Sequence, residues 1–191
     1  DYLCYKISGV FSTDVSDASG TLYFDVKNRT WSKEMCEILS IKEEWLPKVY
    51  ESYQAVGTLK PEIAGELGLS PEVKIAAGAG DNAAAAVGTG IVGKGALNIS
   101  LGTSGTLFIP SECFRMDEHN ALHAFAHADG NYHLMGCMLS AASCNMWWMD
   151  EIIGTKEYGK EQENIKNLGE NQVYFLPYLM GERSPHTDPL A

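Results

Sequence analysis

Short apolar runs and amphipathic blocks follow one another along this chain. Period-two alternation, or a short apolar run between turn residues, predicts strands and hairpins, at residues 22–25, 73–80, 95–110, 123–139 and 172–179. Apolar residues with helical spacing predict helices, at residues 1–9, 32–41, 60–69, 81–92 and 140–154. Strands that alternate with helices in this order predict an α/β fold.

Capping residues support several of these helices. Ser32 is a suitable N-cap, and acidic residues follow it in the first turn of its helix. Pro61 and Gly68 suit the first helical position and the exit of the next helix. Asp81 stands at the start of a helix of small residues, where we expect it to act as the cap. In the strand expected at residues 22–25, alternation places Leu22 on the same face as Phe24.

Net charge excludes some classes of partner. The 191 residues carry a formal net charge of −11. No basic stripe offsets the repulsion of phosphates, so we expect neither nucleic acid nor an acidic membrane surface as a partner. If a ligand carries phosphate, backbone N–H groups, a metal or a local lysine must hold it.

Cysteine usage predicts the compartment. The five cysteines are odd in number and form no C-x-x-C pair, so we expect buried free thiols in a reducing cytosol, at Cys4, Cys36, Cys113, Cys137 and Cys144. The sequence shows no signal peptide and no apolar run of membrane-spanning length, and a cytoplasmic location is the expectation.

The two ends predict an internal fragment of a longer protein. The first helical face has no room for a cap before it, and the chain ends in the Pro-rich segment "SPHTDPLA".

Composition changes near Gly93–Gly95. We therefore expect one domain to end at residue 93 and a second to begin at residue 94.

The stretch "AGAGDNAAAAVGTG" sets a single carboxylate, Asp81, among Gly and Ala. One interpretation is a helix cap. A second is a dinucleotide-binding turn, since "GAGDNA" fits G-x-G-x-x-A. That motif expects an acid about 20 residues on, but the next carboxylate is Glu112, and Asp81 would itself repel the pyrophosphate. We discount it.

The third interpretation couples Asp81 to "SLGTSG", residues 100–105, which offers backbone N–H groups and three hydroxyls between two expected strands. Alone this is a hairpin turn. Such a turn can also wrap a terminal phosphate, while a separate carboxylate accepts a proton from the attacking hydroxyl. Together the two motifs indicate phosphoryl transfer from ATP.

Other patterns have plainer interpretations. His119, His123 and His127 recur every four residues, but the alternation around them predicts a hairpin rather than a zinc site. Trp147 and Trp148 are adjacent on a helix, which indicates core packing more than a sugar-stacking platform. A polar cluster could support a sugar site from behind, although a hydrogen-bonded turn is the simpler role, at Thr13, Asp14, Ser16 and Asp17.

Taken in order, "TDVSDASGTLYFDV", "GLSPEVKIAAGAGDN", "SLGTSG", "HLMGCMLSAAS" and "YFLPYLMGERSPHTDP" resemble the FGGY family of carbohydrate kinases over essentially the whole chain. The resemblance implies two actin-like, ribonuclease-H-like domains that close on ATP and sugar, with this chain covering the end of the first and the start of the second. It implies that the chain alone is inactive.

The resemblance also implies site residues. Asp81 matches the family's catalytic base and binds substrate, and Asn82 matches a sugar contact. The second phosphate loop matches Gly102, Thr103 and Ser104, with Thr103 nearest the γ-phosphate. Ala142 and Asn145 match a helix beside the nucleotide. The resemblance gives no chemical role to Glu182, Arg183 or His186, for which a structural turn is expected.

The implied reaction is ATP-dependent phosphorylation of a sugar's terminal hydroxyl, with Mg²⁺ on the ATP phosphates and no metal ligand assigned in this chain. Asn82 with the alanine run resembles the members of the family that act on xylulose, so the resemblance implies D-xylulose as the sugar. The alternatives are another ketose, gluconate or glycerol, or a non-catalytic nucleotide-binding sensor on the same scaffold. A homodimer would suit the family.

Overall fold

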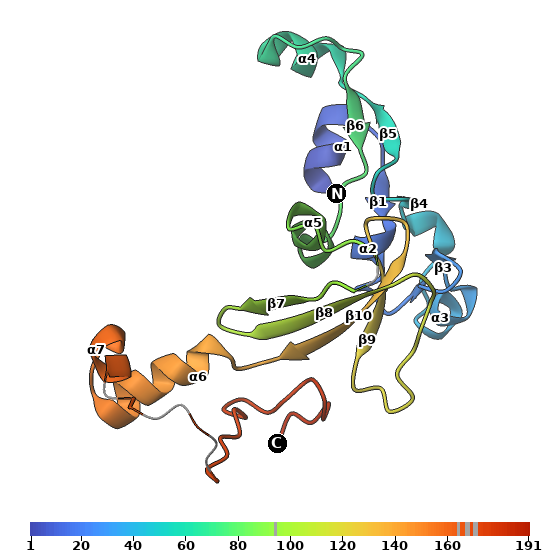
Figure 1. Cartoon of the computed structure of the whole chain (residues 1–191). Helices are drawn as coiled ribbons and strands as arrows, with labels where there is room; N and C mark the ends of the chain where they lie inside the picture. The colour runs from blue at the N-terminus through green and yellow to red at the C-terminus, as the bar shows by residue number, and fades with distance from the viewer. Residues whose placement is uncertain (94, 164, 167–168, 170–171) are drawn as a thin grey trace. The chain divides into compact units, whose positions relative to one another are not determined.

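The computed structural model describes residues 1–93, 95–163, 165–166, 169 and 172–191 (Figure 1). Its helices are α1 (Tyr2–Ser8), α2 (Val15–Ala18), α3 (Lys33–Ile38), α4 (Pro61–Leu67), α5 (Asp81–Gly88), α6 (Ala142–Trp147) and α7 (Tyr158–Glu163). Its strands are β1 (Ser12–Asp14), β2 (Phe24–Asp25), β3 (Thr30–Trp31), β4 (Lys48–Tyr50), β5 (Ala55–Thr58), β6 (Lys74–Ala76), β7 (Asn98–Leu101), β8 (Gly105–Ser111), β9 (His123–Ala126) and β10 (Tyr132–Met138). A 3₁₀ turn lies at Glu43–Trp45, and a π-helical turn at Trp148–Ile153 continues α6.

The strands form several separate small sheets. Strands β1 and β4 pair in parallel, while β2 pairs with β3 and β5 with β6 in antiparallel fashion. A larger sheet has the strand order β7-β8-β10-β9. Contacts divide the chain into two units: the first comprises Asp1–Asn98, Phe108–Asp117 and His123–Met135, and the second Ile99–Leu107, Glu118–Leu122 and Gly136–Ala191.

The expected helix ends are mostly confirmed. The Ser32 hydroxyl accepts the N–H of Met35 at 3.2 Å and caps α3. Pro61 is the first residue of α4, and Gly68 ends that helix with a left-handed φ of 64°. A side chain is strained in that conformation, so glycine is the residue that exits the helix most easily.

The core of the first unit forms around α2. Val15, Ala18, Phe24 and Ala126 are buried together, and partly buried hydrophobic side chains of neighbouring strands pack against them. The Ser19 hydroxyl donates to the Val15 carbonyl at 2.6 Å and accepts the Ala126 N–H at 3.0 Å. These bonds fix α2 against β9.

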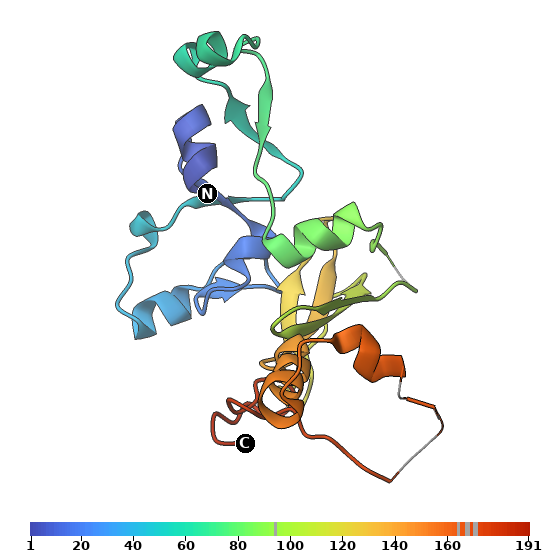
Figure 2. The ribbon, with the colours of Figure 1, turned by 90° about the vertical axis from the view of Figure 1, so that its left-hand side faces the viewer.

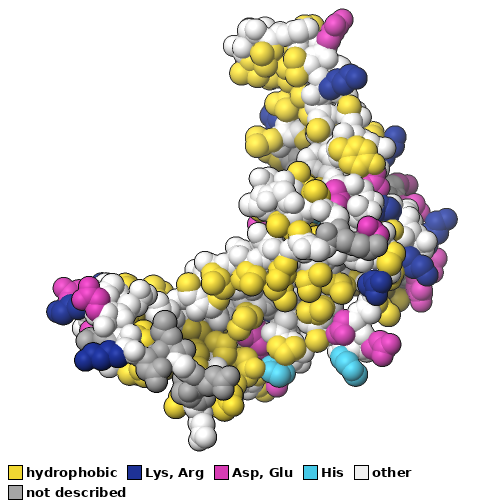
Figure 3. Space-filling view, viewed as in Figure 1, with side chains coloured by type: hydrophobic (Ala, Val, Ile, Leu, Met, Phe, Trp, Pro, Cys, Tyr) yellow, Lys and Arg dark blue, Asp and Glu magenta, His cyan; other side chains and the backbone are white. Residues whose placement is uncertain are grey.

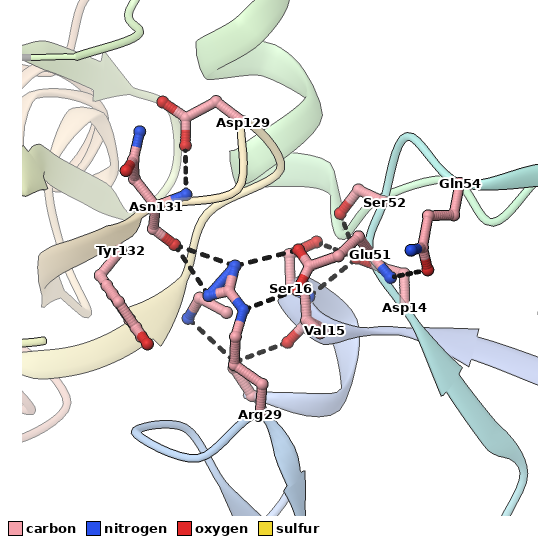
Figure 4. A network of polar contacts seen from close by, with 12 residues as sticks. Asp14, Val15, Ser16, Arg29, Glu51, Ser52, Gln54, Asp129, Asn131 and Tyr132 are labelled. Atoms are coloured by element: carbon pink, nitrogen blue, oxygen red, sulfur yellow. Dashed lines mark hydrogen bonds and ion pairs between the residues drawn. The ribbon is translucent and has the colours of Figure 1, made fainter. Parts of the chain in front are cut away.

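A second tie joins the β2–β3 hairpin both to Glu51, which follows β4, and to the turn between β9 and β10 (Figure 4). The Arg29 guanidinium donates to both carboxylate oxygens of Glu51, at 2.7 and 3.0 Å, and to the Asn131 carbonyl at 3.2 Å. It also lies 4.8 Å from the ring centre of Tyr132. The Arg29 side chain is 17 % exposed, so these contacts are shielded from water.

The hairpin interpretation of residues 123–139 is confirmed. Strands β9 and β10 pair antiparallel, with His133 opposite Phe125. His127 lies fully buried beyond β9, where Nδ1 accepts the Ala128 N–H and Nε2 contacts the Ile91 carbonyl. The described residues contain no group of three His, Cys, Asp or Glu side chains that could hold a metal ion.

Three expectations about strands are wrong. Leu22 is 78 % exposed whereas Phe24 is buried, because the chain turns before β2 and the two side chains do not share a face. The segment 73–80 forms only the short strand β6, and its residues are not buried, since β5 alone pairs with it in the described sheets. Residues 173–178 adopt no strand, and Tyr174 is 87 % exposed.

Apolar side chains are also visible at the surface. Figure 3 shows them gathered over β7 and β8, where Ile99 and Leu101 are 61 % and 73 % exposed. The adjacent tryptophans only partly fulfil the expected core packing: Met149 is buried beside them, but Trp148 remains 46 % exposed. All five cysteines are free, but Cys113 is exposed and Cys4 is only half-buried, so the expectation of buried thiols fails at these two.

Candidate functional site

The start of α5 places Asp81, but Asp81 does not cap the helix. The N-cap residue is Gly80, and Asp81 is the first helical residue. Its Oδ1 accepts the backbone N–H of Asn82 at 2.7 Å and the side-chain amide of Asn82 at 3.1 Å. Among the described residues, none donates to Oδ2. The expected capping role is therefore wrong, and one carboxylate oxygen is available to a ligand.

Asp81 and Asn82 both line a pocket of about 180 Å³ in the first unit. Helix α2 and the turn after it form one wall, α5 another, and the β9–β10 hairpin a third; α5 and α2 lie side by side in both ribbon views (Figures 1 and 2). The lining residues are Ser16, Asp17, Gly20, Gly80, Asp81, Asn82, Ala83, Phe125, His133 and Met135. The pocket thus holds two carboxylates, and among the described residues that line it there is no Lys or Arg.

The polar cluster expected behind the site contributes Ser16 and Asp17 to the pocket lining and continues into the buried Asp14. Asp14 is 2 % exposed, and it caps α2 by accepting the N–H groups of Ser16 and Asp17. The hydroxyls of Ser16 and Ser52 each donate to Asp14 Oδ2 at 2.6 Å. The Ser16 hydroxyl in turn accepts the N–H of Gly80 at 3.0 Å. The cluster is therefore a hydrogen-bonded turn that also contacts the start of α5.

His133 forms part of the opposite wall. Its ring stacks on Phe108 with centroids 3.9 Å apart and on Phe125 at 5.3 Å. Burial, with a smaller contribution from His127, lowers the pKa of His133 to about 3. The imidazole is therefore neutral at physiological pH and adds no positive charge to the pocket.

The second unit holds the expected phosphate loop between β7 and β8. Gly102, Thr103 and Ser104 are all exposed. The Gly102 and Thr103 carbonyls accept the N–H groups of Ala142 and Ala141, each at 2.9 Å. The Gly102 N–H is used within the loop, where it donates to the Ser104 carbonyl. In the part of the chain that the structure describes, no hydrogen-bond partner is seen for the N–H and hydroxyl groups of Thr103 and Ser104.

These bonds bring the loop and Ala142 together at the first turn of α6. Asn145 lies on the same helix and is exposed. Gly105 allows the close approach, because a Cβ there would stand 3.1 Å from that of Ala141. Asp81 and Asn82 belong to the first unit, whereas the loop, Ala142 and Asn145 belong to the second.

The segment with the sequence "GERSPH" fastens the end of β10. Glu182 is 1 % exposed, and its Oε1 accepts the N–H groups of Leu139 and Arg183 at 2.9 and 2.8 Å. The Arg183 guanidinium contacts the sulfur of Cys137, and His186 bonds the Tyr178 hydroxyl at 2.7 Å. These contacts match the structural turn expected for this segment.

Sequence reasoning missed part of the pocket wall. Phe125, His133 and Met135 come from a hairpin that follows Asp81 by more than forty residues, and none was assigned to the site. The alternation in "HLMGC" could have placed His133 and Met135 on one face of a strand. Which face meets α5 is decided by tertiary packing.

Comparison with known proteins shows which family this chain resembles. Residues 1–88 match the N-terminal domain of the FGGY family of carbohydrate kinases. The chain is 41 % identical over 194 residues to the xylulose kinase of Escherichia coli, and this match covers all of the chain but 40 % of that protein. The chain thus spans about two fifths of the length of the relatives it matches.

Solved structures agree. A xyloylose kinase from Brucella ovis superposes on the whole chain with a TM-score of 0.93 at 39 % identity, over 40 % of its own length. A gluconate kinase from Lactobacillus acidophilus does so with a TM-score of 0.88 at 27 % identity, over 39 % of its length.

In the described residues, no helix is long and apolar enough to cross a membrane. The likenesses confirm the predicted α/β fold of the actin-like ATPase type. The chain belongs to the FGGY family of carbohydrate kinases.

Proposed function

We propose that the full-length protein containing this chain phosphorylates the terminal hydroxyl of a sugar with ATP, and that Asp81 is the general base. The observation that carries the proposal is the pocket in which Asp81 offers an unbonded oxygen beside Asn82. A carboxylate so placed can accept the hydroxyl proton as the sugar oxygen attacks phosphorus. The oxygen–phosphorus bond to the γ-phosphate forms, the bond to the bridging oxygen breaks, and ADP leaves.

Thr103 and Ser104 are the proposed contacts to the transferred phosphate. Their amides and hydroxyls are exposed donors, while the carbonyls of Gly102 and Thr103 are tied to the start of α6. A loop anchored through its carbonyls presents its N–H groups to an anion. Ala142 and Asn145, on that helix, are the proposed neighbours of the nucleotide.

The described side chains do not fit a metal cage, because no three metal-ligating residues lie together. None of these residues is therefore assigned to Mg²⁺. The ion would be brought by ATP as part of the substrate and would offset the negative charge of its phosphates.

The charges of the pocket favour a neutral sugar over an aldonate. Asp17 and Asp81 both line it, and His133 is held neutral. A substrate carboxylate in this pocket would face two like charges with no cation of the described lining to offset them. Gluconate is therefore the weaker candidate, and the 41 % identity to a xylulose kinase makes D-xylulose the preferred neutral sugar.

The test is ADP release by the full-length protein with D-xylulose, L-ribulose, glycerol and gluconate, followed by identification of the phosphorylated carbon by ³¹P NMR. We expect the highest kcat/KM with D-xylulose and a phosphate on the terminal oxygen. Turnover preferring gluconate would contradict the charge argument. ATP binding with no turnover on any of the four would favour a sensor.

A further inference from the structure

We infer that Ser16, held by Asp14, is a positioning residue that fixes Asp81 through the backbone of Gly80. The inference rests on the proposed function of Asp81 as the base. It assigns a role to a buried polar cluster that touches the candidate base only through other groups.

No side chain caps the start of α5. Gly80 is the N-cap and has no side chain to bond the first turn. Its carbonyl accepts the N–H of Ala84 at 2.9 Å as the helix begins, and its N–H donates to the Ser16 hydroxyl at 3.0 Å. Gly80 is thus held from both sides, and Asp81 follows it directly. A shift of Gly80 must move Asp81.

Asp14 fixes the direction of the Ser16 hydroxyl. A hydroxyl has one proton and two lone pairs. Ser16 gives its proton to Asp14 Oδ2 at 2.6 Å, a short bond to a charged acceptor, so a lone pair is left for the Gly80 N–H. An alanine at position 16 has no hydroxyl, so the Gly80 N–H would lose this acceptor.

Asp14 itself is immobilised by three segments of the chain. It belongs to β1, it accepts the Ser16 N–H at 2.8 Å from α2, and it accepts the Ser52 hydroxyl at 2.6 Å from the connection between β4 and β5 (Figure 4). It is 2 % exposed. Buried networks that are fully bonded are rigid. The hydrogen bond from the Gly80 N–H to the Ser16 hydroxyl therefore holds Gly80 in place.

Catalysis by a base depends strongly on position, since a displacement of about 1 Å can cost about 100-fold in rate. We therefore expect Ser16→Ala to lower kcat by about 10- to 100-fold in the full-length protein. KM for ATP should stay within about twofold. Ser16→Thr keeps a hydroxyl on the same carbon and should restore kcat to within about fivefold of wild type.

Ser19→Ala is the matched control. Ser19 lies at the end of the same helix and is 7 % exposed against 8 % for Ser16. Each hydroxyl donates one hydrogen bond and accepts one, but Ser19 bonds Val15 and Ala126 instead of Asp14 and Gly80. The two alanine variants should lose similar stability in urea unfolding, while only Ser16→Ala loses kcat.

Ser16 also lines the pocket, so the split between kcat and the KM for sugar decides its role. A raised KM for sugar with unchanged kcat would mean direct sugar contact and would overturn the inference. Equal loss of kcat in Ser16→Ala and Ser19→Ala would do the same, as would a folded Ser16→Thr that fails to recover.

Asp81→Asn, assayed alongside, separates this inference from the function on which it rests. If Asp81→Asn abolishes turnover while Ser16→Ala matches Ser19→Ala, only the positioning role fails. If Asp81→Asn retains turnover, the base assignment fails, and the positioning role fails with it.

Discussion

Asp81 presents its carboxylate among small residues at the start of α5. It does not cap the helix, because the N-cap is Gly80 and Asp81 bonds only its neighbour Asn82 among the described residues. Small residues beside Asp81 now have a use, since Gly80 and Ala83 line the pocket without filling it.

His133 gives a prediction about pH at the same scale. Its pKa lies near 3 in the folded protein against an ordinary value of 6.5, so below pH 6.5 the unfolded chain binds a proton that the folded chain does not. Stability therefore falls as pH drops from about 6.5 to about 3, by up to about 1.4 kcal/mol per pH unit. Above pH 6.5 His133 adds no pH dependence.

His133→Phe should flatten this decline, since phenylalanine can stack on Phe108 and Phe125 but does not titrate. Urea unfolding of the full-length protein at pH 8, 6 and 5 measures it. His119→Phe is the control, because His119 is exposed and its removal should leave the slope unchanged. Parallel declines in wild type and His133→Phe would contradict a neutral buried imidazole.

Elements defined by local chemistry were predictable from the sequence, whereas those defined by distant contacts were not. The Ser32 cap, the Pro61 start and the Gly68 exit depend on neighbours within a few residues, and all three are confirmed. The apolar run at 172–179 predicted a strand, but residues 173–178 form none, because a strand forms only when another supplies its hydrogen bonds. For Leu22 the error was one of direction, since alternation holds only while the backbone stays extended.

The residues of the candidate site also fall into two groups: those that local motifs predict, and those that only tertiary contacts bring to the site. Asp81, Asn82 and the 102–104 loop stand in recognisable motifs, and the structure places the first pair in one pocket. The wall that contains His133 comes from a distant hairpin, which no local pattern could orient toward α5. The link from Ser16 to Gly80 joins residues 64 positions apart, so it too depends on the tertiary fold.

The Arg29 tie gives a prediction at the scale of elements. Arg29→Ala would remove the Arg29 bonds to the Glu51 carboxylate and to the Asn131 carbonyl, which keeps only the N–H of His127, and would weaken the contact of the β2–β3 hairpin with the β9–β10 turn. Losing hydrogen bonds to a charged group should cost about 1–3 kcal/mol, measured by urea unfolding.

An exposed ion pair serves as the control for Arg29. Lys42 and Glu44 lie 3.8 Å apart with side chains 66 % and 73 % exposed, so Lys42→Ala should change the free energy of unfolding by less than about 1 kcal/mol. If Arg29→Ala costs no more than Lys42→Ala, the tie does not hold the hairpins together.

At the scale of the whole molecule, this chain accounts for about two fifths of an FGGY kinase relative. It provides a pocket with a carboxylate in one unit and a loop of exposed donors in the other. Phosphoryl transfer needs both kinds of group on one substrate pair. The full-length protein is therefore the object on which the function must be tested.

The central claim is that Asp81 acts as a base, and a second carboxylate in the same pocket provides its control. Asp81→Asn and Asp17→Asn are the same change of a charge to an amide, and Asn at position 81 can still accept the Asn82 N–H. The measurement is kcat of both variants with D-xylulose in the full-length protein, after circular dichroism shows each to be folded. We predict a loss of about 100- to 10,000-fold for Asp81→Asn, and a kcat within about tenfold of wild type for Asp17→Asn. Equal losses, or an active Asp81→Asn, would contradict the account.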